Sequence, residues 1–313
     1  MNKNNDIDLS VNLGPMLFAN PVIAASGTFG YGIEFDPFVD LNKLGGFCTK
    51  GLSMQPKLGN RFPRMTETSS GMLNSIGLEN IGLDRFIIEK LPIIEKFKSR
   101  LIVNFFGDTI GEYVDMARAL SKLDRVDALE MNVSCPNVEK GGTRFCSDPL
   151  TLKQVVESVR KVSKKFLIVK LSPNVKDITE LALAAEGGGA DALSLINTFV
   201  GLKIDVKSGK PWLANTTGGV SGPAIKPMAL SMVYETARTV KIPVIGIGGI
   251  SSVEDALEFL IAGASAIQIG TANYIDPSIT IKVIDGLYRY CKKNNLKSLT
   301  GLPSLKNDGV DYF

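Results

Sequence analysis

The chain has 313 residues, of which 44% are hydrophobic and 21% charged, a composition typical of a soluble enzyme with a substantial core and not of a disordered segment. Its formal net charge is only +3, and no long basic run is present, which argues against nucleic acid as the main partner. No apolar stretch approaches the roughly 18 residues that span a bilayer, and the amino terminus lacks the form of a signal peptide. We therefore expect a cytoplasmic protein that does not bind a membrane.

Short β-branched runs alternate with amphipathic segments along the whole chain, as in parallel strands joined by crossover helices. Each run is followed by a helix-like segment, and in one of these Ser251 and Glu254 have the spacing of a capping box while Gly263 ends the segment. Eight such units predict an α/β protein with a TIM (β/α)8 barrel, formed as one domain over residues 1–313. The alternative is an open doubly wound sheet, but its usual Gly-rich fingerprint is missing after the first strand. The predicted strands are residues 21–25, 47–50, 101–106, 128–134, 166–171, 192–197, 243–248 and 266–270.

Three further segments interrupt the regular alternation. Residues 9–18 suggest a hairpin that closes the far end of the barrel. Residues 51–78 and 199–223 form long connections, and loops of this length usually carry function. The second of them reads as a hairpin around residues 207–210. We expect both connections to fold over a ligand.

Polar residues or glycines stand at the end of every predicted strand. In a barrel, active-site groups project from the carboxyl ends of the strands. Any one of these residues has an ordinary structural explanation, but their recurrence at all eight ends predicts an active site. In strand order the ends carry Ser26-Gly27, Thr49-Lys50, Asn104, Asn132 with Cys135, Lys170, Asn197-Thr198, Gly248-Gly249 and Gly270-Thr271.

The last two strand ends predict a phosphorylated cofactor. Gly248-Gly249 and Gly270-Thr271 leave backbone N–H groups open where barrels often hold a phosphate, although Gly-Gly after a strand can also form a simple tight turn. Lys50 and Lys170 add positive charge, which suits flavin mononucleotide (FMN) because its reduced ring is anionic. The alternative for either lysine is an ion pair with a carboxylate.

Four asparagines, Asn74, Asn132, Asn137 and Asn197, offer uncharged donors and acceptors near the same strand ends. Such groups are suited to a small heterocycle edged with amide and imide groups, so we expect a heterocyclic substrate. One or two of them can instead hold loops through Asx turns.

The chain has no histidine, which excludes a Ser-His-Asp triad, a Cys-His pair and a His-ligated metal centre. The cysteines show no CxxC spacing, so we expect no metal site and no iron–sulfur cluster in this chain. Cys135 becomes the leading candidate for a general base, because a modest shift of a thiol pKa near 8.5 would let it accept a proton from carbon. Cys48 is expected to be buried and structural, whereas Cys146 has no assigned role beyond a position near the site.

Together these motifs resemble the dihydroorotate dehydrogenase family across essentially the full chain. A cysteine at position 135 and the lack of an extra amino-terminal helix are similar to the soluble class 1 enzymes, and residues 26–30 and 219–224 look like class 1B, the NAD-linked branch. The other matching segments are residues 20–30, 49–51, 74–77, 132–137, 170–173, 197–198, 221–227 and 246–249.

The resemblance implies oxidation of dihydroorotate to orotate in pyrimidine biosynthesis, with Cys135 removing the C5 proton and flavin N5 receiving the C6 hydride. It also implies a homodimer of this chain bound to two smaller subunits that carry FAD and a [2Fe–2S] cluster and pass electrons to NAD. Lys50 would contact both flavin and substrate. Substrate contacts are implied for Lys50, Asn74, Ser75, Ile76, Gly77, Leu78, Asn132, Asn137, Asn197 and Thr198. Flavin contacts are implied for Ser26, Gly27, Lys50, Gly51, Asn104, Asn132, Lys170, Ile196, Gly222, Gly248, Gly249, Gly270 and Thr271.

Three other readings stay open at the level of sequence. The first is a fumarate-linked class 1A enzyme, which differs at both class 1B segments. The second is a flavoenzyme similar to tRNA-dihydrouridine synthase, against which the modest charge and the lack of a basic domain argue. The third is a flavin scaffold that only relays electrons, against which the retention of Cys135 and the asparagines argues.

Overall fold

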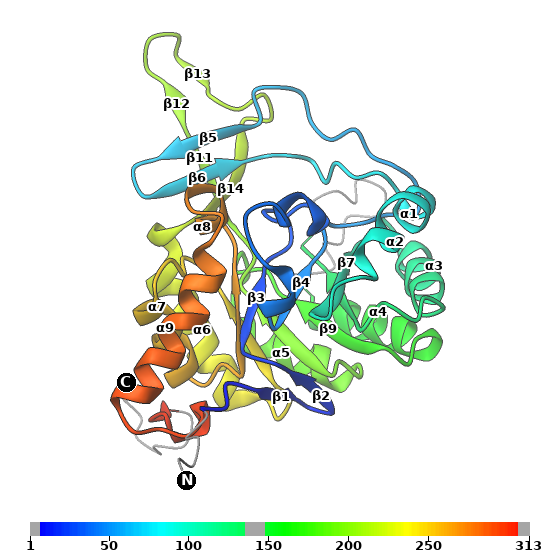
Figure 1. The fold of residues 1–313 in the computed structure, drawn as a ribbon. Coiled ribbons are helices and arrows are strands. Elements are labelled where there is room, and N and C mark those ends of the chain that lie inside the picture. The colour runs from blue at the N-terminus through cyan, green and yellow to red at the C-terminus, as the bar shows by residue number, and fades with distance from the viewer. Residues whose placement is uncertain (1–6, 135–147, 306–313) are drawn as a thin grey trace.

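The computed structural model describes residues 7–134 and 148–305, and its central feature is a closed barrel of eight parallel strands (Figure 1). The strands follow one another around the barrel in chain order, and the last pairs with the first to close it. This confirms the predicted barrel, and the open-sheet alternative is wrong. The strands are β3 (Val22–Ala24), β4 (Gly46–Cys48), β7 (Arg100–Phe105), β8 (Ala128–Asn132), β9 (Phe166–Lys170), β10 (Ala192–Leu195), β15 (Val244–Ile247) and β16 (Ala266–Ile269).

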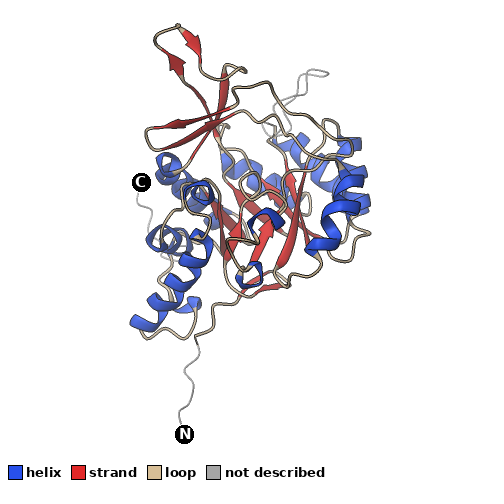
Figure 2. Ribbon diagram, turned by 45° about the horizontal axis from the view of Figure 1, so that its top comes forward, coloured by secondary structure: helices blue, strands red, loops and turns tan. Residues whose placement is uncertain are grey.

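Most of the helices surround the strands, as Figure 2 shows, and several begin at a polar residue that caps a free backbone N–H. The side chains of Thr109, Asp148 and Asp177 accept hydrogen bonds from the first turns of α3, α4 and α5. These caps fix the residues at which the three helices begin. The outer helices are α3 (Ile110–Leu120), α4 (Pro149–Val162), α5 (Ile178–Gly187), α6 (Lys226–Thr239), α7 (Val253–Ile261), α8 (Ala272–Ile275) and α9 (Ile279–Lys293).

The predicted capping box before α7 is displaced by one residue. Ser252, not Ser251, is the N-cap and accepts from Asp255 N–H at 3.1 Å, while the Asp255 carboxylate accepts from Ser251 N–H at 2.9 Å. The acidic partner is therefore Asp255 and not Glu254. Gly263 follows the helix with φ +111°, which confirms the predicted end.

The prediction that every strand is followed by a helix is wrong for β3, because only the 3-10 turns η1 (Ile33–Phe35) and η2 (Leu41–Lys43) follow it. Gly30 and Gly32 adopt positive φ values, which interrupt helical backbone before it can propagate. Phe29 and Phe35 stack with ring centroids 4.0 Å apart and fill the space where a helix would pack. After β4 the helical stretch is α1 (Leu83–Arg85), the π-helical turn η3 (Phe86–Lys90) and α2 (Leu91–Ile94), and the 3-10 turns η4 (Pro223–Ile225) and η5 (Leu299–Gly301) complete the set.

The amino-terminal hairpin closes one end of the barrel, as predicted. It consists of β1 (Val11–Leu13) and β2 (Met16–Phe18), and it lies at the bottom of the view in Figure 1. Its fully buried Leu13 and Phe18 pack in one cluster with inward-facing side chains of the barrel strands. This end of the barrel is therefore filled by an apolar layer, which consists of Leu13, Phe18, Ile23, Cys48, Ile102, Ala128, Phe166, Ile168, Ala192, Ile245 and Ala266.

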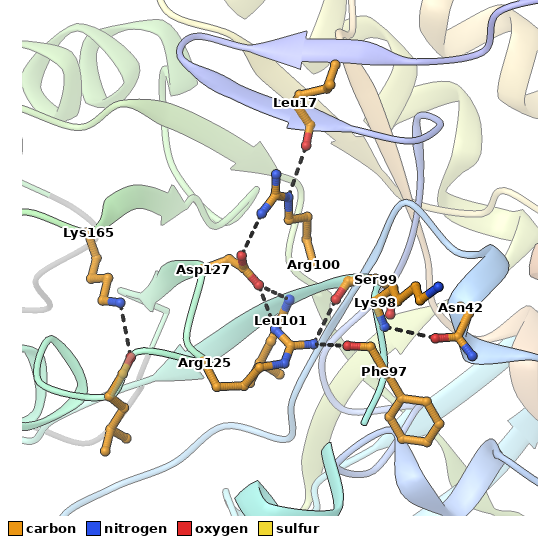
Figure 3. A network of polar contacts seen from close by, with 11 residues as sticks. Leu17, Asn42, Phe97, Lys98, Ser99, Arg100, Leu101, Arg125, Asp127 and Lys165 are labelled. Carbon is orange, nitrogen blue, oxygen red and sulfur yellow. Dashed lines mark hydrogen bonds and ion pairs between the residues drawn. The ribbon is translucent and has the colours of Figure 1, made fainter. Parts of the chain in front are cut away.

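A charged network holds the hairpin and the neighbouring loops to this closed end (Figure 3). Asp127 accepts hydrogen bonds from Arg100 Nη1 at 2.8 Å, Arg125 Nη1 at 2.7 Å and Leu101 N–H at 2.8 Å. Arg100 Nε also donates to the Leu17 carbonyl of the hairpin at 3.0 Å. The network joins β2, the start of β7 and the loop before β8.

At the opposite end the two long connections form a single antiparallel sheet, visible at the top of Figure 1. The connection after β4 contributes β5 (Met65–Thr68) and β6 (Gly71–Asn74), and the connection after β10 contributes β11 (Phe199–Leu202) and β14 (Thr217–Ser221). The strand order is β11-β14-β6-β5. The predicted hairpin around residues 207–210 is confirmed as β12 (Ile204–Asp205) and β13 (Lys210–Pro211). In residues 7–134 and 148–305, no helix is long and apolar enough to cross a membrane.

Candidate active site

A polar layer lies inside the barrel directly above the apolar layer, on the side of the carboxyl ends. Side chains that point to the same face of a strand are two residues apart. In five strands, the residue two positions after a member of the apolar layer is polar. The pairs are Ile102 and Asn104, Ala128 and Glu130, Ile168 and Lys170, Ala192 and Ser194, and Ala266 and Gln268. The floor of the barrel mouth is therefore polar, and it lies directly on the apolar layer.

Glu130 is the centre of this polar layer, and it is fully buried. Its Oε1 accepts from Asn104 Nδ2 at 2.7 Å and from Lys170 Nζ at 3.5 Å. Its Oε2 accepts from Gln268 Nε2 at 2.7 Å and from Ser194 Oγ at 2.9 Å. One carboxylate thus joins side chains from five strands of the barrel.

The sequence reasoning missed Glu130, Ser194 and Gln268, because the run that contains Glu130 was treated as a continuous apolar strand. A signal was present, since Glu130 lies two residues before Asn132 and therefore faces the same side of β8. A glutamate in the middle of a buried strand is expected to have bound partners, because an unpaired buried charge is very costly.

The ionisation of Glu130 is fixed by its surroundings. Burial alone raises the pKa of Glu130, but the Lys170 ammonium and the hydrogen bonds from Gln268, Asn104 and Ser194 outweigh burial and lower the pKa below its ordinary value. The carboxylate is therefore negatively charged at neutral pH and only accepts hydrogen bonds.

Cys48 lies next to this layer and is structural, as predicted. It is fully buried in the apolar layer. Burial, followed by the nearby negative charge of Glu130, raises the pKa of the Cys48 thiol well above its usual value. The thiol is protonated at neutral pH. The backbone of Ser26, a predicted flavin contact, forms a hydrogen bond with it.

Both predicted lysines have carboxylate neighbours, the alternative that the sequence left open. Lys170 pairs with the buried Glu130. Lys50 follows β4, and its Nζ lies 3.9 Å from Glu79 Oε2, while Glu79 also pairs with Arg64. The Lys50 side chain is 29% exposed, so its ammonium is accessible to a ligand at the mouth.

The structure brings the predicted asparagines of β8 and β10 together. Asn132 Oδ1 accepts from Asn197 Nδ2 at 3.3 Å and also from Ser134 N–H at 3.1 Å. Asn197 Oδ1 accepts from Thr198 N–H at 2.9 Å. The bond from Ser134 to Asn132 matches the Asx-turn alternative, and Asn197 and Asn132 lie side by side at the mouth. Asn74 lies in the covering sheet, where its Nδ2 donates to the Gly219 carbonyl at 3.4 Å.

Residues 75–78 run from the covering sheet back toward the barrel, and Asn60 shapes this segment. Asn60 Nδ2 donates to the Ser75 carbonyl at 2.9 Å, and Asn60 N–H donates to the Ile76 carbonyl at 2.9 Å. A Cβ on Gly77, where φ is +78°, would lie 2.5 Å from Asn60 Cγ, so this position requires glycine. Leu78 also has a positive φ of 57°. Ser75 Oγ is buried and has no hydrogen-bond partner among the described residues.

Glycines form close backbone contacts after β14 and β15. Gly249 has φ +70°, and a Cβ there would lie 2.9 Å from the Gly222 carbonyl oxygen. Gly222 itself has φ +97°, and a Cβ there would lie 2.6 Å from Gly71 Cα. A Cβ on Gly248 would lie 2.5 Å from Ala229 Cβ. Glycine is therefore required at these three positions for the close approach and for the positive φ values.

The ends of β16 and β3 lie beside these glycines. Thr271 Oγ1 donates to Ser221 Oγ at 2.7 Å, which links the end of β16 to β14. Gly270 has open space around its Cβ position, with the nearest heavy atom 3.8 Å away. Gly27 has φ +90° and nothing within 4 Å of a Cβ. Ile196 is buried, and its N–H donates to the Ile247 carbonyl at 2.9 Å.

The described residues fit a cofactor that carries hydrogen-bond donors and a phosphate. Asn104 Oδ1 and Gln268 Oε1 are buried acceptors without a partner in the described part of the chain. A Cβ on Gly51 would lie 2.9 Å from Asn104 Oδ1, so the close approach of this oxygen to the Gly51 backbone requires glycine. Cys135, Asn137 and Cys146 lie outside the described residues. Within residues 7–134 and 148–305, no cluster of three or more His, Cys, Asp and Glu could hold a metal ion.

A closed parallel barrel with lysines, carboxamides and glycine turns gathered at one mouth defines a (β/α)8-barrel enzyme. Comparison with known sequences gives the family. The sequence model described as "Dihydroorotate dehydrogenase" matches residues 8–290, and the chain belongs to this family, whose members are oxidoreductases.

Similar curated proteins carry the name "Dihydroorotate dehydrogenase B (NAD(+)), catalytic subunit". The protein from Parabacteroides distasonis is 52% identical over 295 residues, which are 94% of this chain and 97% of that protein. The protein from Pelobacter propionicus is 53% identical with the same coverage, and that from Bacteroides thetaiotaomicron is 52% identical over 93% of this chain and 96% of its own length. These matches confirm the family inferred from the motifs.

Proposed function

We propose that this chain is the catalytic subunit of an NAD-linked dihydroorotate dehydrogenase, which oxidises dihydroorotate to orotate in pyrimidine biosynthesis. The observation that carries the proposal is identity of about half over nearly the full length to proteins named as such subunits. The structure supports it with a barrel mouth that combines basic and carboxamide side chains.

The proposed cofactor is FMN. Dihydroorotate dehydrogenases depend on a flavin, and the mouth offers buried acceptors, a paired lysine and glycine turns for such a group. When bound, FMN supplies a two-electron acceptor for the hydride that leaves C6 of the substrate. The residues proposed to hold it are Ser26, Gly27, Lys50, Gly51, Asn104, Asn132, Lys170, Ile196, Gly222, Gly248, Gly249, Gly270 and Thr271.

The proposed catalytic residues are Cys135 and Lys50. Cys135 would take the C5 proton of dihydroorotate as a general base, since a thiolate at a pKa near neutrality combines the correct protonation state with adequate basicity. Lys50 would place positive charge against substrate and flavin, and its partial exposure beside Glu79 leaves its ammonium accessible.

Substrate binding is proposed for the asparagine pair at the mouth and for the segment that descends from the covering sheet. Carboxamides can both donate to and accept from the amide and imide edge of a pyrimidine. The unpartnered Ser75 Oγ adds a further donor or acceptor. The proposed substrate contacts are Lys50, Asn74, Ser75, Ile76, Gly77, Leu78, Asn132, Asn137, Asn197 and Thr198.

The proposed assembly is a homodimer with two electron-transfer subunits that carry FAD and a [2Fe–2S] cluster. The names of the relatives identify a catalytic subunit, which implies a further subunit in those proteins. Several apolar side chains of the covering sheet and its hairpin are exposed, as expected for surfaces that meet another chain. They are Val200 at 66%, Leu202 at 51%, Ile204 at 54%, Val206 at 91% and Trp212 at 42% exposure.

The reaction is tested by anaerobic titration of the purified flavoprotein with dihydroorotate, while the visible absorption of the flavin is followed. We expect the absorption to bleach in the isolated chain. Flavin that stays yellow would contradict the proposed activity. Reoxidation is then followed with NAD, with and without the co-purified small subunit, and with fumarate. NAD reduction that needs the small subunit supports the NAD-linked assignment, whereas direct reoxidation by fumarate contradicts it.

A further inference from the structure

The polar layer contains one feature that the proposed roles do not use, the buried carboxylate of Glu130. An ionised carboxylate only accepts hydrogen bonds, so Asn104 and Gln268 must each turn their NH2 group toward it. Their carbonyl oxygens then point away from Glu130. Because the charge determines the orientation of both amides, the positions of these two acceptors follow from the presence of Glu130.

Both oriented oxygens lack a partner in the part of the chain that the structure describes. Asn104 Oδ1 and Gln268 Oε1 are buried, and leaving a buried acceptor unpaired is unfavourable. The apolar layer lies below them and the barrel strands lie around them. The mouth is the side left for the approach of a ligand donor. Oxidised flavin brings a ring N–H and ribityl hydroxyls as donors.

Glu130 also holds the side chain of Lys170 in place. Its side chain is 7% exposed, and Glu130 Oε1 at 3.5 Å is its recorded carboxylate partner within residues 7–134 and 148–305. An ammonium has three donors, so one bond to Glu130 leaves N–H groups for a ligand. The pair fixes the direction of the lysine side chain in the interior.

We propose that Glu130 is a positioning residue for the flavin, which locks Asn104 and Gln268 with their carbonyl oxygens facing the mouth and holds Lys170 beside them. The inference rests on the proposed binding of FMN and adds the residue that sets the hydrogen-bond pattern of its site. Glu130 acts through these three side chains and does not itself touch the flavin.

The principal test is Glu130→Gln, which keeps the shape and removes the charge. Lys170 cannot accept a hydrogen bond, so the introduced amide must turn its oxygen to Lys170 and Asn104 and its NH2 to Ser194 and Gln268. Gln268 must then reverse, which places its NH2 where an acceptor faced the mouth. We expect the Kd of the apoprotein for FMN to rise at least about tenfold.

The same variant has a second readout in the flavin potential. Loss of a buried negative charge favours the anionic reduced flavin, so we expect the midpoint potential to rise. A tenfold change in the ratio of reduced to oxidised flavin at a fixed potential corresponds to about 30 mV for a two-electron couple. A residue that only stabilises the fold would change the melting temperature without moving the potential.

Exchange of the side chains at positions 130 and 268 should restore the binding of FMN. In Glu130→Gln/Gln268→Glu the amide at position 130 donates to the carboxylate at position 268 and still accepts from Asn104 and Lys170. An acceptor again faces the mouth at position 268. We expect the Kd for FMN to return to within about threefold of the wild-type value.

Ser194→Ala is the matched control, because it removes one hydrogen bond to the same carboxylate and leaves Asn104, Gln268 and Lys170 in place. It should lower the melting temperature and leave the Kd for FMN and the midpoint potential unchanged. If Ser194→Ala weakens FMN binding as much as Glu130→Gln does, general damage to the interior explains both and the proposal is overturned.

The outcomes separate this inference from the proposed function. A wild-type chain that does not bind FMN contradicts the proposed function itself. Wild-type affinity and potential in Glu130→Gln contradict only the role of Glu130. If Glu130→Gln does not fold, the exchanged variant decides, since a folded protein with poor FMN affinity overturns the proposal. If that variant also fails, Gln268→Met removes the oriented acceptor, and unchanged affinity for FMN overturns the proposal.

Discussion

At the amino-terminal end of the barrel, Asp127 accepts three hydrogen bonds, and the two arginines that donate to it also bind backbone carbonyls (Figure 3). At the carboxyl end, Glu130 likewise gathers donors from several strands, but two of its partners, Asn104 and Gln268, keep unpaired carbonyl oxygens. Both networks contain a carboxylate and cations. They differ in what is left unpaired among the described residues: two carbonyl oxygens at the mouth, and Arg125 Nε at the closed end.

This difference separates a network that stabilises the fold from one prepared for a ligand. An unpaired atom alone does not make the distinction, since Ser99 Oγ and Arg125 Nε also lack partners at the closed end. The mouth is distinguished by two unpaired acceptors on side chains that both donate to one buried charge, Glu130. Changes at the mouth should therefore affect flavin and substrate, and changes at the closed end should affect stability.

The largest effect on activity is expected for Cys135→Ser, at the proposed general base. Loss of a well-placed general base typically slows a proton transfer by about 10² to 10⁴-fold. We expect anaerobic stopped-flow measurements to show flavin reduction slowed to this extent at neutral pH, with partial recovery at higher pH and unchanged binding of orotate. Reduction at the wild-type rate would move the role of base to another group.

Asp127→Ala at the closed end should have the opposite profile. Removal of this carboxylate leaves Arg100 and Arg125 without their shared partner, and we expect a loss of about 2 to 3 kcal/mol in the free energy of unfolding. Urea denaturation measures the loss, and the Kd for FMN measured on the folded protein should not change. A strong effect on FMN affinity would break the distinction between the two ends.

Asp255→Asn tests an ion pair behind the glycine turn of β15, where Lys226 Nζ lies 2.6 Å from Asp255 Oδ1. Burial raises the pKa of Asp255, but the hydrogen bonds from Lys226 and Ser251 outweigh burial and lower it. The stabilisation is therefore complete above the unfolded pKa of about 3.9 and is lost as pH falls through the lower folded value.

We expect Asp255→Asn to lose about 1 kcal/mol at pH 7 and the gap from the wild type to close on acidification. Urea denaturation of the wild type and the variant, at pH 7 and at acidic pH, measures this gap. A difference that persists unchanged in acid would show that the charge of Asp255 is not responsible.

The smallest effect is expected for Arg118→Ala. Arg118 pairs with Asp115 on the exposed face of α3, with both side chains about half exposed. Such surface pairs contribute less than about 1 kcal/mol, so the free energy of unfolding should change by under about 0.5 kcal/mol. This variant is the control for Asp127→Ala, because both remove one side of an Arg–Asp pair. Equal losses of stability in the two variants would mean that burial does not determine how much an Arg–Asp pair contributes.

The barrel was predictable because its signal is local. Each strand is a short β-branched run, and all eight predicted runs contain most of an observed strand. The predicted ends lay one or two residues too far in several cases, as in residues 192–197 against β10 (Ala192–Leu195). Polar residues such as Asn197 already belong to the loop, where their side chains bind local backbone. The hairpin over residues 9–18 was equally local and was confirmed.

The remaining features depend on contacts between distant parts of the chain. Nothing in residues 51–78 alone indicates that β6 pairs with β14, because the partners lie about 145 positions apart. The strand ends indicated where the mouth lies, and the roles of the residues there stay predictions. Glu130 was missed because residues 128–134 were considered as one run. In a strand only every second side chain faces the barrel interior, and Glu130 is one of these. Its partner Gln268 lies 138 positions away and becomes visible only when the barrel closes.

The pairing of β6 with β14 also determines how a ligand gains access to the mouth. Residues 51–78 and 199–223 leave the barrel from β4 and β10, yet backbone hydrogen bonds join them into one sheet. They cannot separate as independent flaps without breaking that pairing, so ligand exchange requires displacement of the whole sheet or passage around its edges. Because the two connections form one sheet, a substitution in either of them is expected to change the rates of ligand entry and release.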